Sequence, residues 1–290
     1  MRRLAFLSTD NLEGFVSDDE RAVAPLAARG WAVETVSWRQ PCDWNRFDMV
    51  IIRSTWDYQK DAARFLNVLE RIDASRALLQ NDLELVRWNI RKTYLRDLQA
   101  KGNRIVPTIW QEGSVSPEKL EGFYEQLHSE EIIIKPLISA NADHTFRLRR
   151  KDIPFHYDKL RHIFAGRAFM AQPFMKNIIT EGEYSLFYFG GEYSHAILKT
   201  PQQNDFRVQE EHGGIITAVK AEEKLRRRGE AAMGSLGQIP LYARVDLVRD
   251  AGDEFAIMEV ELIEPALYFR MDAPAAERFA EAVNRRAGGG

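Results

Sequence analysis

Three acidic residues and one arginine near the C-terminus have a spacing that could hold a metal ion. Arg244 and Asp246 lie two residues apart in an apolar run, and Glu259 and Glu261 repeat this spacing after the turn signal Ala251-Gly252. Because side chains alternate along a strand, each pair would lie on one face of its strand. If the hairpin loop holds an even number of residues, all four groups lie on the same side of the sheet.

This crowding has two interpretations, a metal site and a structural ion-pair cluster. Carboxylates about 5 to 8 Å apart under partial cover repel each other, so one must protonate unless a cation neutralises it. Oxygen ligands without nearby His or Cys favour Mg²⁺ or Mn²⁺ over zinc. Phe255 and Ile257 are expected on the same face, and such apolar neighbours argue against an ordinary solvated sheet surface.

A series of separated cations precedes this cluster along the chain. Lys135 follows three isoleucines, where its charge must meet solvent or an anion. The small-residue loop that begins at Ser139 can place backbone N–H groups along phosphates. Cations and carboxylates together suit phosphoryl transfer, in which positioning and charge neutralisation do most of the catalysis. The cations are Lys92, Lys135, Lys199, Arg207 and Arg244.

A polar and aromatic segment follows the strand predicted at residues 49–52. We interpret it as a small-molecule site in which Arg53 pairs with a carboxylate and Asp57 pairs with an amine. The alternative is a loop whose aromatic side chains cover the core. The candidate substrate-binding residues are Arg53, Ser54, Trp56 and Asp57.

Alternating strand and helix signals predict an α/β fold with a mostly parallel N-terminal sheet. Strands are predicted at residues 4–8, 32–38, 49–52 and 78–80. A capping box of Ser17 and Glu20 predicts one helix. The helical spacing of the apolar residues within 62–72 predicts another. Ligands in such sheets bind beyond the carboxyl ends of the strands.

The rest of the chain mixes helices with hairpins, as expected for α+β regions. One long helix is predicted over residues 81–101, and others near 117–127, 222–236 and 273–282. Strands are predicted at 105–110, 131–137, 145–148, 169–175, 183–189 and 192–199, with Gly190-Gly191 as a hairpin turn. The predicted regions are an N-terminal substrate domain (1–85), a central domain (86–168) and a C-terminal domain (169–285).

Composition excludes several classes of function. The net charge of −3 over 290 residues argues against nucleic-acid binding by bulk electrostatics. One cysteine, Cys42, excludes an internal disulfide, and no apolar run reaches transmembrane length. We therefore expect a cytoplasmic protein with no nucleic-acid or membrane partner. Because no Gly-Lys dipeptide occurs, the chain has no Walker A loop.

The order of the motifs resembles the ATP-grasp superfamily, in particular its glutathione synthetase/RimK-like carboxylate–amine ligases. The match covers nearly the whole chain. Segments such as residues 54–58 and Glu264-Pro265 are similar to the group that contains the cycloserine-forming (O-ureido-serine cyclo-ligase) enzyme. The motifs that carry the resemblance are Lys92 on a helix, Ile-Ile-Ile-Lys135-Pro, Gln172-Pro-Phe-Met, Gly182-Glu183, Arg244-Val-Asp246 and Glu259-Val-Glu261.

The resemblance implies three subdomains, with ATP in a cleft between the central and C-terminal domains. It implies an ATP-dependent ligase that joins a carboxylate to an amine through an acyl-phosphate and releases ADP and phosphate. Lys92 and Lys135 would contact the nucleotide phosphates, with Ser139 in the loop that covers them. The adenine and ribose would be recognised by Gln172, Phe174, Met175 and Glu183.

The resemblance also implies two Mg²⁺ ions, with Mn²⁺ as an alternative, held by Asp246, Glu259 and Glu261. Arg244, helped by Lys199 and Arg207, would stabilise the acyl-phosphate and the tetrahedral species. The chain departs from the family in two places: Glu261 stands where Asn is common, and the loop 138–144 lacks the usual glycines.

Two other functions share these residues, a non-catalytic ATP-binding regulatory module and a small-molecule kinase. The substrate is expected to be an amino-acid-like molecule or small peptide that carries a carboxylate and an amine. The sequence motifs do not distinguish an intramolecular cyclisation from a ligation of two separate substrates. The resemblance also suggests a homodimer.

Overall fold

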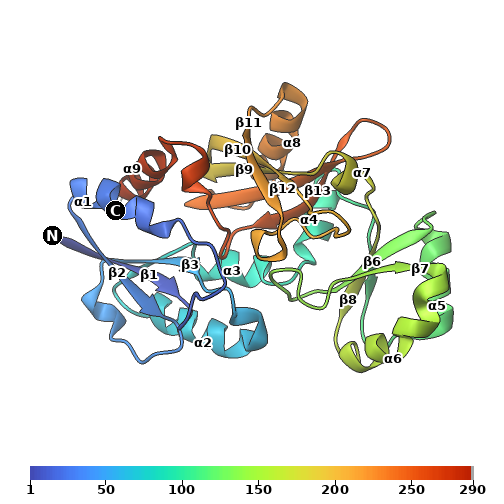
Figure 1. Cartoon of the computed structure of the whole chain (residues 1–290). Coiled ribbons are helices and arrows are strands. Elements are labelled where there is room, and N and C mark those ends of the chain that lie inside the picture. Colours follow the sequence, from blue (N-terminus) through green and yellow to red (C-terminus); the bar gives the residue numbers. More distant parts are fainter. Residues whose placement is uncertain (289–290) are drawn as a thin grey trace.

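The computed structural model describes residues 1–288, which form three β-sheets with helices packed around them (Figure 1). The first sheet is parallel, in the order β2-β1-β3-β4. Parallel neighbours need crossover connections, and helices supply them here. The predicted α/β fold class is confirmed. The strands are β1 (Arg2–Ser8), β2 (Trp31–Ser37), β3 (Met49–Ser54) and β4 (Leu78–Gln80).

Two helices of the first region are α1 (Val23–Ala28) and α2 (Ala62–Asp73). The apolar face of α2, which includes Phe65 and Leu69, packs against the sheet. The predicted capping box is wrong, because the Ser17 hydroxyl accepts the backbone N–H of Asp19 at 3.3 Å. A 3-10 turn (Asp19–Ala22) then precedes α1.

The second sheet is antiparallel, in the order β5-β8-β6-β7. It shares an apolar core with α5 (Pro117–Gln126) and α6 (Ile153–Ile163), and α6 was not predicted (Figure 1). β8 lies in this sheet, although the sequence placed its residues in the third region. The strands are β5 (Ile109–Gln111), β6 (Glu131–Pro136), β7 (Phe146–Arg149) and β8 (Phe169–Pro173).

The third sheet has the order β11-β10-β9-β12-β13 and is antiparallel. One of its faces packs on α9 (Ala275–Gly288) and the first region, and the other packs on α8 (Glu223–Gly234). α7 (Asn177–Thr180) precedes it. The strands are β9 (Glu183–Phe189), β10 (Glu192–Thr200), β11 (Ile215–Val219), β12 (Tyr242–Arg249) and β13 (Phe255–Glu261). Gly190 and Gly191 form the predicted turn with φ of 58° and 84°.

The long helix predicted over residues 81–101 is broken into α3 (Leu83–Asn89) and α4 (Tyr94–Ala100). At the break the backbone N–H of Lys92 donates to the carbonyl of Leu137 at 2.8 Å. The Asn89 side chain donates to the carbonyl of Val260 at 2.8 Å. These tertiary bonds replace helical ones, and the break presents Lys92 to the third sheet.

The strand predicted at residues 105–110 is also interrupted. Ile105 makes only an isolated bridge with Ile257, and Pro107 has no N–H to continue a ladder. The chain then passes to the second sheet as β5. No helix within residues 1–288 has the length and apolarity needed to cross a bilayer. The remaining 3-10 helices are Trp44–Arg46, Tyr58–Lys60, Arg150–Asp152, Glu210–His212 and Phe269–Met271.

Candidate active site

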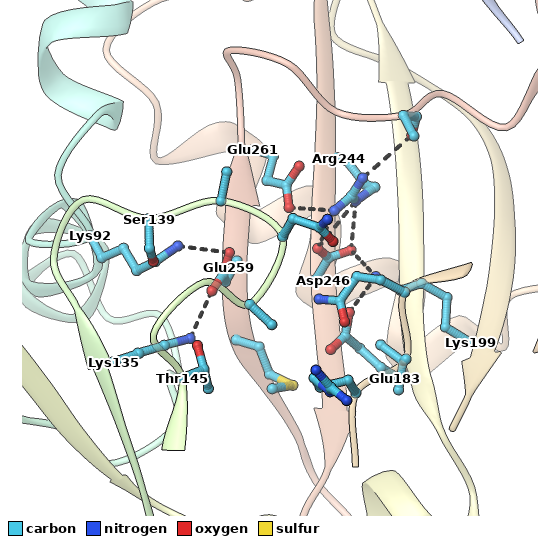
Figure 2. Close-up of a pocket in the computed structure, with 18 of the residues that line it drawn as sticks. Lys92, Lys135, Ser139, Thr145, Glu183, Lys199, Arg244, Asp246, Glu259 and Glu261 are labelled. Carbon is cyan, nitrogen blue, oxygen red and sulfur yellow. Dashed lines mark hydrogen bonds and ion pairs between the residues drawn. The ribbon is translucent and has the colours of Figure 1, made fainter. Parts of the chain in front are cut away.

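A cavity is lined by residues from all three sheet regions. The first region contributes Trp56, the second contributes Lys135, and the third contributes Arg244. Figure 2 shows the charged centre of this cavity, where side chains from distant parts of the chain point toward one another. The cavity therefore lies where the three regions meet.

The β12–β13 hairpin brings the four predicted groups together. Arg244 pairs with Glu261 and Asp246 pairs with Glu259 in the antiparallel register. All four line the cavity (Figure 2). The predicted common face is thus confirmed, because directly opposed residues of two strands point to the same side.

The expected apolar neighbours Phe255 and Ile257 lie on the other face of the sheet. A β-bulge between the Asp246 and Leu247 pairings places Ile257, not Met258, opposite Leu247. One extra residue reverses the face of the side chains beyond it. Phe255 and Ile257 therefore pack in the core behind the hairpin, and Met258 lines the cavity instead.

Glu259 accepts ion pairs from two lysines. Lys135 Nζ lies 2.7 Å from Oε1 and Lys92 Nζ lies 3.0 Å from Oε2 (Figure 2). Lys135 comes from the end of β6 and Lys92 from the α3–α4 break. Both lysines are more than 90% buried. The sequence predicted these residues as one group, and the structure brings them into contact.

A second set of ion pairs surrounds Asp246. Arg244 donates to both carboxylate oxygens of Asp246, with Nε 3.0 Å from Oδ1 and Nη2 3.0 Å from Oδ2, and it also pairs with Glu261. Lys199 Nζ lies 3.4 Å from Asp246 Oδ1 and pairs with Glu183. The hydroxyl of Ser185, to which the sequence assigned no role, donates to Asp246.

The charges of this cluster do not balance. The cluster consists of five carboxylates (Glu183, Asp246, Glu259, Glu261 and Glu264) and four cations (Lys92, Lys135, Lys199 and Arg244), all of which line the cavity. Because the acids outnumber the cations by one, the cluster favours binding of a further positive charge.

The pKa shifts divide the acids into two groups. Burial alone would raise the pKa of Glu259, but Lys135 and Lys92 outweigh burial and hold that pKa well below its usual range. Arg244 and Lys199 likewise outweigh burial and lower the pKa of Asp246. Burial raises the pKa of Glu261 to about 7, and the charges of Asp246 and Glu259 add to this effect.

Asp246, Glu259 and Glu261 offer a set of oxygen donors suited to Mg²⁺. Within residues 1–288, however, no three His, Cys, Asp or Glu side chains are grouped closely enough to hold an ion by themselves. Phosphate oxygens and water usually complete the octahedral shell of Mg²⁺. The acid surplus and the donor chemistry therefore fit a metal that arrives with a phosphate-bearing ligand.

The residues predicted to recognise the nucleotide base line a largely apolar part of the same cavity. Gln172 Nε2 donates to the hydroxyl of Thr108 at 3.0 Å. The Arg147 guanidinium lies 3.8 Å from the centre of the Phe174 ring. Met175 lies beside them, and the further apolar residues of this wall are Val106, Ile133, Ile178, Phe206 and Val208.

Ser139 lines the cavity at the start of the loop 138–144. The backbone is left-handed at Asn141, Ala142 and His144, with φ of 50°, 55° and 52°. This conformation is ordinarily favoured by glycine. The loop thus adopts a glycine-like course without glycines, and Asn141 and Ala142 also line the cavity. Arg207 lines the cavity while its Nη2 pairs with Asp205 at 2.7 Å.

Three of the four predicted substrate residues lie outside the cavity lining. Arg53 is 1% exposed and pairs with Asp19 at 2.8 Å. Asp57 pairs with Arg39 at 2.6 Å, and the Ser54 hydroxyl donates to Ser8 at 3.0 Å. The structure thus gives these three side chains partners within the protein.

Trp56 is the one predicted substrate residue that lines the cavity, and it has neighbours that sequence reasoning missed. Phe15, Tyr58, Glu264 and Tyr268 line the same cavity. Tyr58 and Glu264 belong to the two segments that carried the family resemblance, residues 54–58 and Glu264-Pro265, but neither was given a role at the site. Phe15 lies in a loop without a local motif.

Comparisons with known proteins agree with this geometry. Residues 104–255 match the family "Prokaryotic glutathione synthetase, ATP-grasp domain", and residues 4–81 match "D-cycloserine synthetase DcsG, N-terminal domain". The cycloserine biosynthesis protein DcsG of Streptomyces lavendulae is 32% identical over 268 residues, which cover 89% of each chain.

Solved structures have the same fold. The crystal structure of D-cycloserine synthetase DcsG matches 98% of this chain and 99% of its own, with a TM-score of 0.85 and 28% identity. A RimK domain ATP-grasp protein from Sphaerobacter thermophilus matches 99% of this chain and 100% of its own, with a TM-score of 0.70 and 15% identity. The chain therefore belongs to the ATP-grasp ligases, in the family of DcsG, and is an enzyme that uses ATP and Mg²⁺ to join a carboxylate to an amine.

Proposed function

We propose that the chain activates the carboxylate of a small amino-acid-like molecule and closes a ring within it. A carboxylate oxygen attacks the γ-phosphorus of ATP, the bond to the β-phosphate oxygen breaks, and ADP leaves. A nitrogen of the same substrate then attacks the acyl carbon and loses its proton, and phosphate leaves with the electrons of the broken C–O bond. The observation that carries the activation step is the convergence of Lys92, Lys135, Arg244 and the acids of β12 and β13 in one cavity, and the similarity to the cycloserine biosynthesis protein DcsG supports ring closure.

The nucleotide would lie between the second and third sheets. Lys92 and Lys135 would exchange Glu259 for the phosphates, and Ser139 would approach them from the loop. Gln172, Phe174 and Met175 would border the adenine, and Glu183 would accept the ribose hydroxyls once Lys199 turns toward the phosphates. The support is that all these side chains line one cavity.

Asp246, Glu259 and Glu261 would hold two Mg²⁺ ions, and Mn²⁺ would serve as a replacement. When bound, the metal neutralises charge on the phosphates. Glu261 adds a charge where related enzymes often have Asn. The bulge after Asp246 keeps Glu259 and Glu261 on the cavity side of the sheet, which supports this assignment.

Arg244, Lys199 and Arg207 would stabilise the acyl-phosphate and the tetrahedral species. Arg244 is largely buried and already spans Asp246 and Glu261. A guanidinium fixed in this way needs little reorganisation when negative charge develops on a substrate oxygen. Lys199 supplies a second cation from β10.

The similarity to DcsG supports an O-ureido amino acid as the first substrate to test. The single free cysteine is consistent with a reducing compartment, and we propose a cytoplasmic location. We also propose a homodimer, which rests on the family resemblance alone.

The test is a screen for ADP release with Mg·ATP against free amino acids, ureido-amino acids and short peptides. We expect release with a ureido-amino acid alone and no need for a second amine. Carboxylate-dependent positional isotope exchange in ATP would support the acyl-phosphate. Release that requires a separate amine would replace cyclisation by intermolecular ligation, and binding of ATP without turnover across the panel would contradict the proposed activity.

A further inference from the structure

Glu264 is the one acid of the charged cluster without a partner. Its side chain lines the cavity, and the residue is 9% exposed. Each of the other four acids has a Lys or Arg within ion-pair distance. Within residues 1–288, no side-chain or backbone donor forms a hydrogen bond with the Glu264 carboxylate. A buried carboxylate without a counter-ion is costly unless a ligand supplies the charge.

The backbone around Glu264 is held by the first region of the chain. Trp56 Nε1 donates to the carbonyl of Glu264 at 2.8 Å, and Arg53 Nη2 donates to the carbonyl of Pro265 at 3.0 Å. Arg53 is itself fixed by Asp19. These two contacts set the position of Glu264, although Arg53 does not reach the cavity.

Three aromatic side chains from the first region line the same cavity as this carboxylate. The rings of Phe15 and Trp56 lie 5.2 Å apart at an angle of 40°. Tyr58 is buried and lines the cavity with them. Aromatic faces beside a carboxylate attract organic ammonium groups through cation–π and ionic interactions.

The surrounding charges separate the two ends of an amino acid. Arg244 and Lys92 would attract its carboxylate, whereas Glu264 is the acid that a bound ammonium group would hold in its ionised form. Burial, together with the charge of Glu261, raises the pKa of Glu264 to about 8, which reflects the missing counter-cation. A bound ammonium group would lower that pKa again.

We propose that Glu264, with Phe15, Trp56 and Tyr58, forms the subsite for the non-reacting α-ammonium group of the molecule whose carboxylate is activated. This inference rests on the proposed function for the identity of that molecule. It assigns Arg53 and Trp56 as positioning residues that hold Glu264 in place.

Ligand binding tests the subsite independently of turnover. The probe is serinamide, which carries an ammonium group and no carboxylate, and its neutral match is N-acetylserinamide. Binding is measured by saturation-transfer NMR and calorimetry on the full chain with saturating Mg·ADP. We expect serinamide to bind the wild type and N-acetylserinamide to bind at least tenfold more weakly.

Matched variants locate the effect. Glu264→Gln should weaken serinamide binding at least tenfold, and Glu264→Asp should weaken it less. The serinamide affinity of Trp56→Phe should lie between those of the wild type and Glu264→Gln. The affinity for Mg·ADP should be unchanged in all three, which shows that they fold. Glu211→Gln, at an exposed edge of the same cavity, should bind serinamide as the wild type does.

Equal binding of serinamide to the wild type and to Glu264→Gln, or no binding to the wild type, would overturn the inference. If no substrate releases ADP in the screen but serinamide binding still depends on its charge, the proposed reaction is contradicted and the ammonium subsite is supported. If ADP release is normal but Glu264→Gln binds serinamide with unchanged affinity, the proposed reaction is supported and the subsite is contradicted.

Discussion

Lys135 Nζ lies 2.7 Å from Glu259 Oε1, so a lysine suited to bind phosphate is held by an acid suited to bind metal. Lys92 holds the other oxygen of Glu259. A single carboxylate thus pairs with two buried cations and offsets only part of their charge, so phosphates could take its place beside the lysines while Mg²⁺ takes theirs beside Glu259. The positive charge left over on the two lysines favours an anionic ligand at this place.

Glu259→Gln should therefore reduce ADP release about a hundredfold or more, because the variant loses a metal-binding charge at the phosphates. Steady-state kinetics over a range of Mg²⁺ concentrations would measure the loss. Nucleotide affinity in the presence of EDTA should be retained, since Lys92 and Lys135 become free to bind phosphate. Full activity in this variant would refute the assignment of Glu259 as a metal ligand.

Arg53→Met should lower the free energy of unfolding by about 3 kcal/mol, because Asp19 would keep a largely buried charge without its partner. Urea unfolding at neutral pH is the measurement. The double variant Arg53→Met with Asp19→Asn should recover part of the loss. A single variant as stable as the wild type would contradict the role given to this pair.

Asp57→Asn should change stability and leave the KM for the amino-acid substrate near the wild-type value. Asp57 accepts hydrogen bonds from Trp38 at 2.7 Å and Arg39 at 2.6 Å, outside the cavity lining. Trp56→Phe is the matched comparison and should raise that KM several-fold while the KM for ATP stays constant. A KM increase in Asp57→Asn with unchanged stability would restore the original interpretation of Asp57 as a substrate residue.

Acid should destabilise the protein through His195. Burial lowers the pKa of this imidazole to about 4, where Nε2 faces the carbonyl of Leu267 at 3.1 Å and the ring stacks on Phe187. The imidazole has a pKa of about 6.5 in the unfolded chain, so between pH 6.5 and pH 4 the unfolded state is protonated at His195 while the folded state is not. Stability due to this group should thus fall by up to about 3 kcal/mol as the pH drops from about 6.5 to about 4.

Unfolding measured between pH 7 and pH 4 tests this expectation. His195→Gln keeps hydrogen-bonding atoms but cannot titrate in this range, so its stability should depend less on pH than that of the wild type. Parallel pH profiles for the two proteins would show that His195 is not the group responsible.

Local patterns were enough to predict many of the elements. The alternation of Arg244 with Asp246 and of Glu259 with Glu261 predicted one shared face, and the structure has it. The same rule failed at Phe255 and Ile257, because a bulge depends on how two strands pair and not on one strand alone. The break at Lys92 was missed for a similar reason, since its partner Leu137 is far away in the sequence.

By itself the sequence determined the fold class, the family resemblance and the charged residues that gather in the cavity, because these follow from residue type, order and short-range periodicity. Only the tertiary structure decided which charges pair and which stay free. In the structure Arg53 pairs with Asp19 and Asp57 pairs with Arg39, whereas Glu264 lines the cavity. Such choices depend on distances between segments far apart in the chain, such as Arg53 and Pro265, which are separated by 212 residues. Side-chain type does not encode those distances locally.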